Sequence, residues 1–296
     1  MRRISALVLA AASLATAAGA QDVTIATAQG EATVPASPEI VVAYDVAAID
    51  TLQSLGVELA GVPDNLYIPS LSADGAETVG TLFEPDLEKL AGIGPDLVVV
   101  GARSAPALNA VSQLAPAIDM TIGSELLEDA KARIAAFGTI FDRQQQAEAL
   151  TATLDDKIAA LGDAAADSGT ALILMTNGTK MAAYGPGSRF GWLHDVTKMP
   201  PAIPELAATE NHGNVLTHEA IAEADPDWLF VLDRGAAIGE DGQSAAQTLA
   251  SPLIEGTTAW QNDQVVYLPA AELYIGGGGY SSLVTVIDAL TEAFGA

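Results

Sequence analysis

The chain has 296 residues and 50% of them are hydrophobic, so it can bury a large core and does not have the composition of a disordered protein. Its 12 Lys and Arg stand against 38 Asp and Glu, and a formal net charge of −26 argues against nucleic acid or an anionic membrane surface as a ligand. The sequence contains no cysteine, which excludes disulfides, thiolate metal sites and a lipid anchor on an N-terminal cysteine.

The first 20 residues have the pattern of a secretory signal peptide. Two arginines precede an apolar run, and Ala18-Gly19-Ala20 forms a small-residue cleavage pattern. No later segment approaches the ~20 apolar residues of a membrane-spanning helix. We therefore predict a signal peptide over residues 1–20 and a mature protein that is free in the periplasm, without a membrane span.

Residues 21–141 are predicted to form an N-terminal α/β lobe. Short apolar segments alternate there with segments of helical periodicity, a pattern typical of βαβ units in a mostly parallel sheet. The expected strands lie within 39–45, 58–64, 95–104 and 117–123, and the expected helices lie within 46–57, 84–94 and 104–116.

The next segment, residues 124–166, has no strand pattern and no proline, and its apolar residues recur at spacings of three and four. We predict two helices. The second lies within residues 142–166, starts near Asp142 and has about 22 residues, so at ~1.5 Å per residue it would span roughly 33 Å and connect two lobes. Alternation returns over the C-terminal lobe, with strands expected within 171–178, 180–187, 226–235 and 265–271 and a last helix from Ser281. The predicted lobes are thus residues 21–141 and 167–296. The predicted fold class is α/β: two Rossmann-like lobes with mostly parallel sheets, one long backbone helix and a ligand cleft between the lobes.

Two segments, one in each predicted lobe, share four residues in a single register, which we interpret as a pseudo-repeat. The first segment contains Glu88, Pro95, Asp96 and Arg103, and the second contains Glu219, Pro226, Asp227 and Arg234. Each arginine follows an apolar strand pattern, and the carboxyl ends of parallel strands are where open α/β sheets bind ligands. Because a guanidinium fork suits anionic oxygens, the pair predicts a shared anionic ligand. An ion pair of Arg234 with Asp233 or Asp227 is the structural alternative.

A third arginine, Arg189, lies between a Gly/Pro turn and a helix start. Ser188 is a candidate N-cap there, and a helix N-terminus favours anions, although an ordinary surface position is an alternative. No Gly-x-Ser-x-Gly elbow, His-Glu-x-x-His pair or cysteine nucleophile accompanies these residues, so we expect no enzymatic activity.

The histidines and two tyrosines of the second lobe are candidate metal ligands. His194 and His218 lie at helix starts, which favours structural roles, whereas His212 lies beside a glycine in an aperiodic loop and is accessible as a ligand. Tyr274 precedes four glycines, which either admit close approach of the backbone or form a flexible turn. Tyr280 follows the same glycines and competes with Tyr274 on chemistry alone.

These features together resemble the periplasmic ferric-siderophore-binding proteins of ABC importers, in the class with a long backbone helix. Within that class the sequence is most similar to the group that binds tetradentate ferric catecholates, such as the enterochelin-uptake binding proteins. The resemblance covers about residues 38–296. The segments that carry it are GTLFEPDLEKLAGIGPDLVVVGARS, TNGTKMAAYGPGSRFGWLHDV, NHGNVLTHEAIAEADPDWLFVLDRG and VVYLPAAELYIGGGGYSSL.

The resemblance assigns roles to the candidate residues. It implies that the three arginines surround the catecholate oxygens of an iron complex, that His212 and Tyr274 coordinate its Fe(III), and that Glu88 and Glu219 dock onto arginines of the permease. The family's usual aromatic before the tyrosine is Leu273 here, and the glycines that follow favour Tyr274 over Tyr280. A solvated glutamate at a helix start is the structural alternative for the two docking residues.

The resemblance also implies partners and a location. The expected partners are a ferric catecholate siderophore and an inner-membrane ABC permease, the expected location is the periplasm, and we expect a monomer with no intrinsic cofactor. The alternative on the same scaffold is a haem- or cobalamin-binding protein, which would need a tyrosine or histidine but not three arginines.

Overall fold

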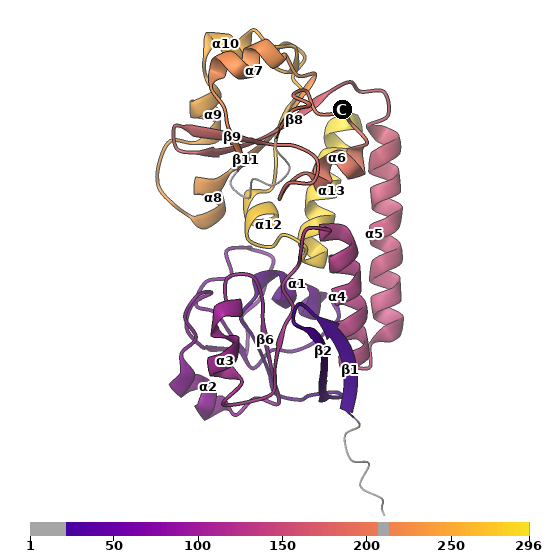
Figure 1. Cartoon of the computed structure of the whole chain (residues 1–296), viewed down its shortest axis with the longest axis vertical. Helices are drawn as coiled ribbons and strands as arrows, with labels where there is room; N and C mark the ends of the chain where they lie inside the picture. The colour runs from indigo at the N-terminus through magenta and orange to yellow at the C-terminus, as the bar shows by residue number, and fades with distance from the viewer. Residues whose placement is uncertain (1–21, 207–212, 296) are drawn as a thin grey trace, which may run out of the picture.

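The computed structural model describes residues 22–206 and 213–295 and contains two lobes stacked along the long axis of the molecule (Figure 1). Each lobe is built around a five-stranded sheet, and a long helix runs along one side of both. The predicted fold class, two α/β lobes with mostly parallel sheets and a backbone helix, is confirmed.

The N-terminal sheet has the strand order β5-β4-β3-β6-β7, and every pair in it is parallel. Its elements, in chain order, are β3 Val41–Ala43, α1 Val46–Ser54, β4 Gly61–Val62, β5 Glu77–Thr78, α2 Leu87–Ile93, β6 Leu97–Val100, η1 Ala105–Ala107, α3 Leu108–Val111 and β7 Ala117–Asp119. All residues of β3 and β6 are buried, as expected for central parallel strands covered on both faces. The helix expected within 104–116 is shorter than predicted, a 3₁₀ turn followed by one turn of α-helix.

A hairpin at the N-terminal end of the described chain was not predicted. β1 Asp22–Thr27 and β2 Gly30–Pro35 pair in antiparallel register, joined by a two-residue loop, and lie beside the N-terminal lobe (Figure 1). Gly30, which closes the loop, has a φ of 101°, a backbone conformation that glycine adopts without strain.

Two helices follow the N-terminal sheet, as the sequence predicts. α4 Leu126–Ile140 is followed by α5 Gln144–Ala164, and Asp142 separates them with a φ of 53°. The 21 residues of α5 span roughly 32 Å at ~1.5 Å per residue, which is enough to lie along both lobes. The prediction that the long helix starts near Asp142 is therefore correct to within two residues.

The C-terminal sheet has the strand order β10-β9-β8-β11-β12, but only β8, β11 and β12 are parallel. A two-residue turn at Gly178-Thr179 joins β8 to β9, and a turn this short can only reverse the chain. The strands and helices of this part of the chain are β8 Ala171–Asn177, β9 Lys180–Tyr184, α6 Trp192–Thr197, β10 Asn214–Val215, α7 His218–Ala224, β11 Trp228–Asp233, α8 Arg234–Ile238, α9 Ala245–Leu249, α10 Pro252–Glu255, α11 Thr258–Gln261, β12 Val265–Tyr267, α12 Ala270–Tyr274 and α13 Tyr280–Gly295.

The last helix, α13, connects the two lobes from the inside. It packs against α5 and against α1 of the N-terminal lobe. At its start the buried carboxylate of Asp50 accepts hydrogen bonds from the backbone N–H groups of Ser281 (2.7 Å) and Ser282 (2.8 Å). The lobes are therefore joined by polar contacts as well as by α5.

The two copies of the pseudo-repeat occupy equivalent places in the fold. β6 and β11 are each the fourth strand of their sheet. In both copies the aspartate before the strand accepts a backbone N–H from the segment that leads into the neighbouring strand: Asp96 from Ile40 at 2.9 Å and Asp227 from Thr170 at 2.7 Å. The Pro-Asp pair of the repeat thus sets the start of the strand, and the arginine follows the other end.

Candidate functional site

The two repeat arginines enter one site from opposite lobes. Arg103 lies in the loop that follows β6, where Ser104 hydrogen-bonds to Gly101, and Arg234 is the residue directly after β11. Both are only partly exposed. The placement agrees with the expectation that the two strand ends face the same space.

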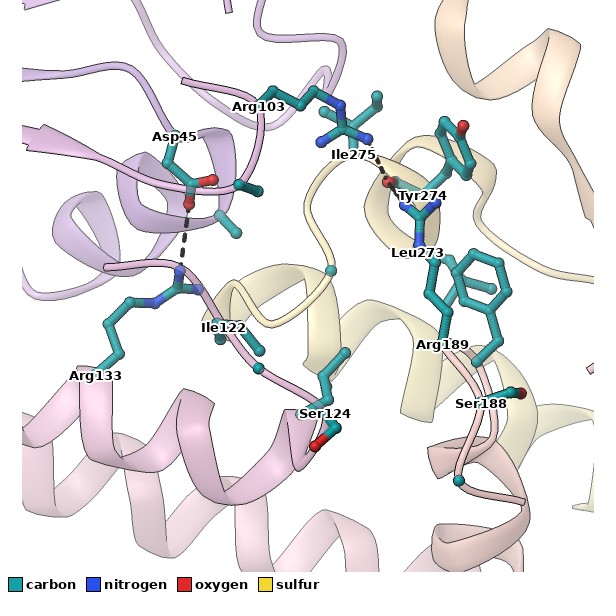
Figure 2. Close-up of a pocket in the computed structure, with 17 residues that line it drawn as sticks. Asp45, Arg103, Ile122, Ser124, Arg133, Ser188, Arg189, Leu273, Tyr274 and Ile275 are labelled. Carbon is teal, nitrogen blue, oxygen red and sulfur yellow. Dashed lines mark hydrogen bonds and ion pairs between the residues drawn. The ribbon is translucent and has the colours of Figure 1, made fainter. Parts of the chain in front are cut away.

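The site is centred on Tyr274, the last residue of α12. Arg103 and Arg189 both donate from Nη2 to the Tyr274 carbonyl oxygen, at 3.0 Å and 2.9 Å. Arg234 donates from Nε to the Tyr274 hydroxyl at 3.1 Å. The guanidinium carbons lie 5.6 Å, 4.4 Å and 5.7 Å from the centre of the tyrosine ring for Arg103, Arg189 and Arg234. Figure 2 shows Arg103 and Arg189 approaching Tyr274 from different segments of the chain.

The loop that carries Arg189 differs in one respect from the prediction. Ser188 is not the N-cap of the following helix, because α6 begins at Trp192 with Gly191 at its cap and no side-chain cap bond. The Ser188 hydroxyl instead donates to the carbonyl of Gly185 at 2.6 Å and fixes a tight turn. Arg189 is exposed and also lies 4.9 Å from the Phe190 ring.

The charges of the site act on each other. Burial lowers the pKa of Arg103, and the nearby charge of Arg189 lowers it further. For Tyr274, burial raises the pKa, but the hydrogen bond from Arg234 and the positive charge of Arg189 outweigh it, so the net shift is downward. The hydrogen bond to Tyr274 in turn raises the pKa of Arg234. The arrangement favours a phenolate and, more generally, anionic oxygen at this place.

A cavity of about 590 Å³ opens beside the tyrosine, between the lobes. Arg103, Arg189 and Tyr274 line it, and Asp45 and Arg133 face it from the other side (Figure 2). The remaining wall is largely apolar and includes Ile122, Leu126, Phe190 and Leu273. An apolar cavity with a few convergent charged groups is typical of a small-molecule site.

Arg234 does not pair with the aspartates expected as its alternative partners. Asp233 accepts the backbone N–H groups of Ala236 and Ala245, and Asp227 binds Thr170 at the other end of the strand. The acidic partner of Arg234 is instead Glu240, at 3.4 Å, and the Asn177 side chain accepts a further hydrogen bond at 3.3 Å. Neither contact was predicted. The contact with Glu240 depends on how the chain folds after β11, where Glu240 donates its backbone N–H to the Gly235 carbonyl at 2.9 Å and Ala245 donates to Asp233 at 2.7 Å.

The candidate metal ligands are only partly placed. His212 lies outside the described residues. The buried ring of His194 hydrogen-bonds through Nδ1 to Met199, and His218 bonds through Nε2 to Thr248, which agrees with structural roles for both. Tyr274 lines the cavity, whereas Tyr280 starts α13 and is not among the lining residues.

The two glutamates of the pseudo-repeat are exposed and lie far from the cavity. Glu88 is in the first turn of α2 and Glu219 in the first turn of α7. These helices lie near opposite ends of the molecule (Figure 1).

The described residues contain neither a ready-made metal cluster nor a membrane-spanning helix. Across residues 22–206 and 213–295, no group of three or more His, Asp or Glu side chains is arranged to hold a metal ion. Within the same ranges, no helix combines the length and the apolar character needed to cross a bilayer.

The fold and the cleft define the class of protein. The chain belongs to the periplasmic binding protein family, whose sequence pattern matches residues 41–272. This is a family of substrate-binding proteins rather than of enzymes.

Individual relatives are similar over most of their length. The petrobactin-binding protein YclQ of Bacillus subtilis is 34% identical over 266 residues, which cover 88% of this chain and 83% of that protein. The ferric-anguibactin-binding protein FatB of Vibrio anguillarum is 30% identical over 276 residues, 90% of this chain and 85% of FatB. The crystal structure of YclQ matches with a TM-score of 0.87 over 93% of this chain and 99% of that structure, at 32% identity. That of the catecholate-siderophore-binding protein VctP of Vibrio cholerae matches with a TM-score of 0.84 and 25% identity over 92% and 100%.

Proposed function

We propose that this protein captures a ferric catecholate siderophore in the periplasm and delivers it to an ABC importer in the inner membrane. The observation that carries the proposal is the convergence of three arginines, drawn from both lobes, on Tyr274 at the edge of the cavity. The names of YclQ, FatB and VctP, which refer to petrobactin, ferric anguibactin and a catecholate siderophore, support this class of ligand.

The arginines account for the charge of the ligand. A ferric complex of a bis-catecholate is anionic, and guanidinium groups donate strong hydrogen bonds to anionic oxygens. On a chain with a formal charge of −26, a cluster of three cations is a local site of opposite sign. The cluster therefore selects an anion that the rest of the surface repels.

Tyr274 and His212 account for coordination in this proposal. Fe(III) is a hard cation that prefers anionic oxygen, and a tetradentate bis-catecholate leaves two of its six positions for the protein. The lowered pKa of Tyr274 favours the phenolate, with burial opposing the shift and Arg234 and Arg189 causing it. The imidazole of His212 would fill the last position in its neutral form.

Delivery involves the outer surfaces of the lobes. We assign Glu88 and Glu219, both exposed and in equivalent copies of the repeat, to docking on basic groups of the permease. Because the two glutamates are on different lobes, the permease would contact both lobes of one monomer at once.

Titration with a ferric bis-catecholamide tests the proposal. Binding of the ferric complex should quench the tryptophan fluorescence of the purified protein. The protein with the complex bound should show resonance Raman bands of a coordinated tyrosinate. In Tyr274→Phe these bands should disappear and affinity should fall, whereas Tyr280→Phe is the matched control and should keep both. Absence of binding by the wild-type protein would refute the function. If Tyr274→Phe binds the complex with an unchanged tyrosinate signal, coordination by Tyr274 is refuted but the proposed function is not.

A further inference from the structure

The segment that follows Tyr274 crosses from the C-terminal lobe to the N-terminal lobe within a few residues. It consists of Ile275 and the glycine turn, defined as residues 276–279, and it leads directly into α13. Within the turn, Gly276 donates to Ala271 at 3.0 Å and Gly279 donates to Gly276 at 2.7 Å. Whatever fixes this turn also fixes the end of α12, where Tyr274 lies.

The glycine turn is held by a buried arginine of the other lobe. Arg133, on α4, has a side chain that is 3% exposed, and its Nη2 donates to the carbonyl of Gly278 at 2.7 Å. Its Nη1 contacts the Asp45 carboxylate at 3.2 Å and the Met120 carbonyl at 3.3 Å. Figure 2 shows the Asp45–Arg133 pair across the cavity from Tyr274. One guanidinium thus joins α1, the end of β7 and the glycine turn.

The turn lies so close to the N-terminal lobe that side chains would not fit. Gly278 has a φ of 85°, and a Cβ there would collide with Ile122. A Cβ on Gly279 would come within 2.5 Å of the Asp50 carboxylate, which binds the first N–H groups of α13. The glycines are therefore required for this contact rather than for flexibility, which decides between the two alternatives that the sequence left open.

The Arg133 contact is a costly way to stabilise the fold. The guanidinium is almost fully buried, and its Nε has no hydrogen-bond partner within the described part of the chain. Buried ion pairs contribute little net stability compared with apolar residues of similar volume, because both charges lose their hydration. What this pair provides is a defined position for the atoms it holds.

We propose that Arg133 is a positioning residue for the iron site, which it serves by holding the glycine turn and, through it, Tyr274 at a fixed place at the edge of the cavity. The proposal rests on the proposed function. Asp45 orients Arg133 and at the same time accepts the Ala48 N–H at 2.8 Å as the cap of α1. In this role Arg133 is not an iron ligand and acts through the Gly278 carbonyl. Tyr274 can then exchange a proton for iron without first becoming ordered.

The first test measures, without ligand, whether Arg133 keeps the glycine turn ordered. Arg133→Met keeps an unbranched apolar stem but removes the guanidinium, with its charge and its hydrogen-bond donors. Amide hydrogen exchange of the peptide that covers residues 274–282 should become about tenfold faster or more in this variant. Lys131→Met is the matched control. Lys131 is on the same helix but does not contact the turn, and the substitution removes its ion pairs with Asp155 (2.8 Å) and Glu128 (3.3 Å). Exchange that is unchanged in Arg133→Met would overturn the proposal.

The second test measures the consequence for the site. Arg133→Met should bind a ferric bis-catecholamide at least about tenfold more weakly than the wild type, the loss typical when a residue that orients a metal ligand is removed. Its tyrosinate Raman bands should weaken or shift. Arg133→Lys, which keeps a charge and part of the reach, should recover part of both signals.

A control for general destabilisation separates positioning from folding. Asp227→Ala removes the bond to Thr170 at the far end of β11 and should lower the melting temperature without affecting the tyrosinate bands. The inference fails if Arg133→Met keeps its affinity for the ferric complex within twofold and keeps its tyrosinate bands. It also fails if Asp227→Ala loses affinity and tyrosinate bands as much as Arg133→Met does, because Arg133 would then have only a structural role. If the wild-type protein itself does not bind the complex, it is the proposed function that fails.

Discussion

The three site arginines should contribute unequally to affinity, in the order Arg103, then Arg234, then Arg189. Arg103 is only partly exposed, and burial is the largest influence on its pKa. The Arg234 side chain is 28% exposed and shared with Glu240, and Arg189 is exposed. Water and salt screen an exposed charge more than a buried one, so equal charges should have unequal effects.

The magnitudes follow from this order. A charge-assisted hydrogen bond in a partly dry site contributes about 1.5–3 kcal/mol, so Arg103→Met should weaken binding about 10- to 150-fold. An exposed ion pair contributes about 0.2–1 kcal/mol, so Arg189→Met should weaken it about 1.5- to 5-fold. Arg234→Met should fall between these limits, since its guanidinium is screened more than Arg103 and less than Arg189.

Fluorescence titration with a ferric bis-catecholamide at low and at high salt measures both the order and the screening. The loss caused by Arg189→Met should nearly vanish at high salt, whereas that caused by Arg103→Met should persist. Arg143→Met, which removes an exposed cation at the N-cap of α5, is the control and should change neither. A loss for Arg189→Met as large as that for Arg103→Met would refute the reasoning.

Four further predictions concern Tyr274, the two exposed glutamates of the pseudo-repeat, and Glu240. Burial raises the pKa of Tyr274, but Arg234 and Arg189 lower it more, so Tyr274 should be the first tyrosine to form a phenolate in an absorbance titration of the free protein. Tyr274→Phe should remove this first phase. Burial raises the pKa of Tyr184 to about 12, so Tyr184 should titrate late. Because binding iron releases the Tyr274 proton, affinity for the ferric complex should fall as the pH falls, and a pH-independent affinity would contradict coordination by Tyr274. Charge reversal at both Glu88 and Glu219 should abolish uptake into proteoliposomes that contain the cognate permease yet leave binding unchanged; retained uptake would exclude their role in docking. Glu240→Gln should raise affinity up to about fivefold by removing a competitor for Arg234, and a fall in affinity would show that the carboxylate assists binding.

The general architecture was predictable because its signals are local. Apolar strands followed by helical periodicity predict a parallel sheet, and the proline-free segment after it predicts α4 and α5. The placement of Arg103 and Arg234 was predictable because the pseudo-repeat puts both at strand ends. A strand was expected within 180–187, but its antiparallel direction was not predicted: Asn177-Gly178 is a hairpin signal, and the expectation of mostly parallel sheets did not say which strand runs the other way.

The contacts around the site were less predictable because they depend on long-range folding. Arg133 shares helical spacing with the buried residues Ala130, Ile134 and Phe137, and that spacing was the one signal that it faces inward. Nothing in the sequence shows that its partner is a glycine carbonyl 145 residues away. The pairing of Arg234 with Glu240 likewise depends on how a surface loop folds back.

The equivalence of β6 and β11 has a consequence for how a ligand is oriented. Arg103 and Arg234 follow equivalent strands of the two sheets, and a chelator with two identical arms could face such a pair in either of two orientations. The hairpin that leads to Arg189 has no counterpart in the all-parallel N-terminal sheet, and Tyr274 likewise comes from one lobe only. These two residues make the two orientations inequivalent, so the two arms of a symmetric chelator meet different surroundings and one orientation should be favoured.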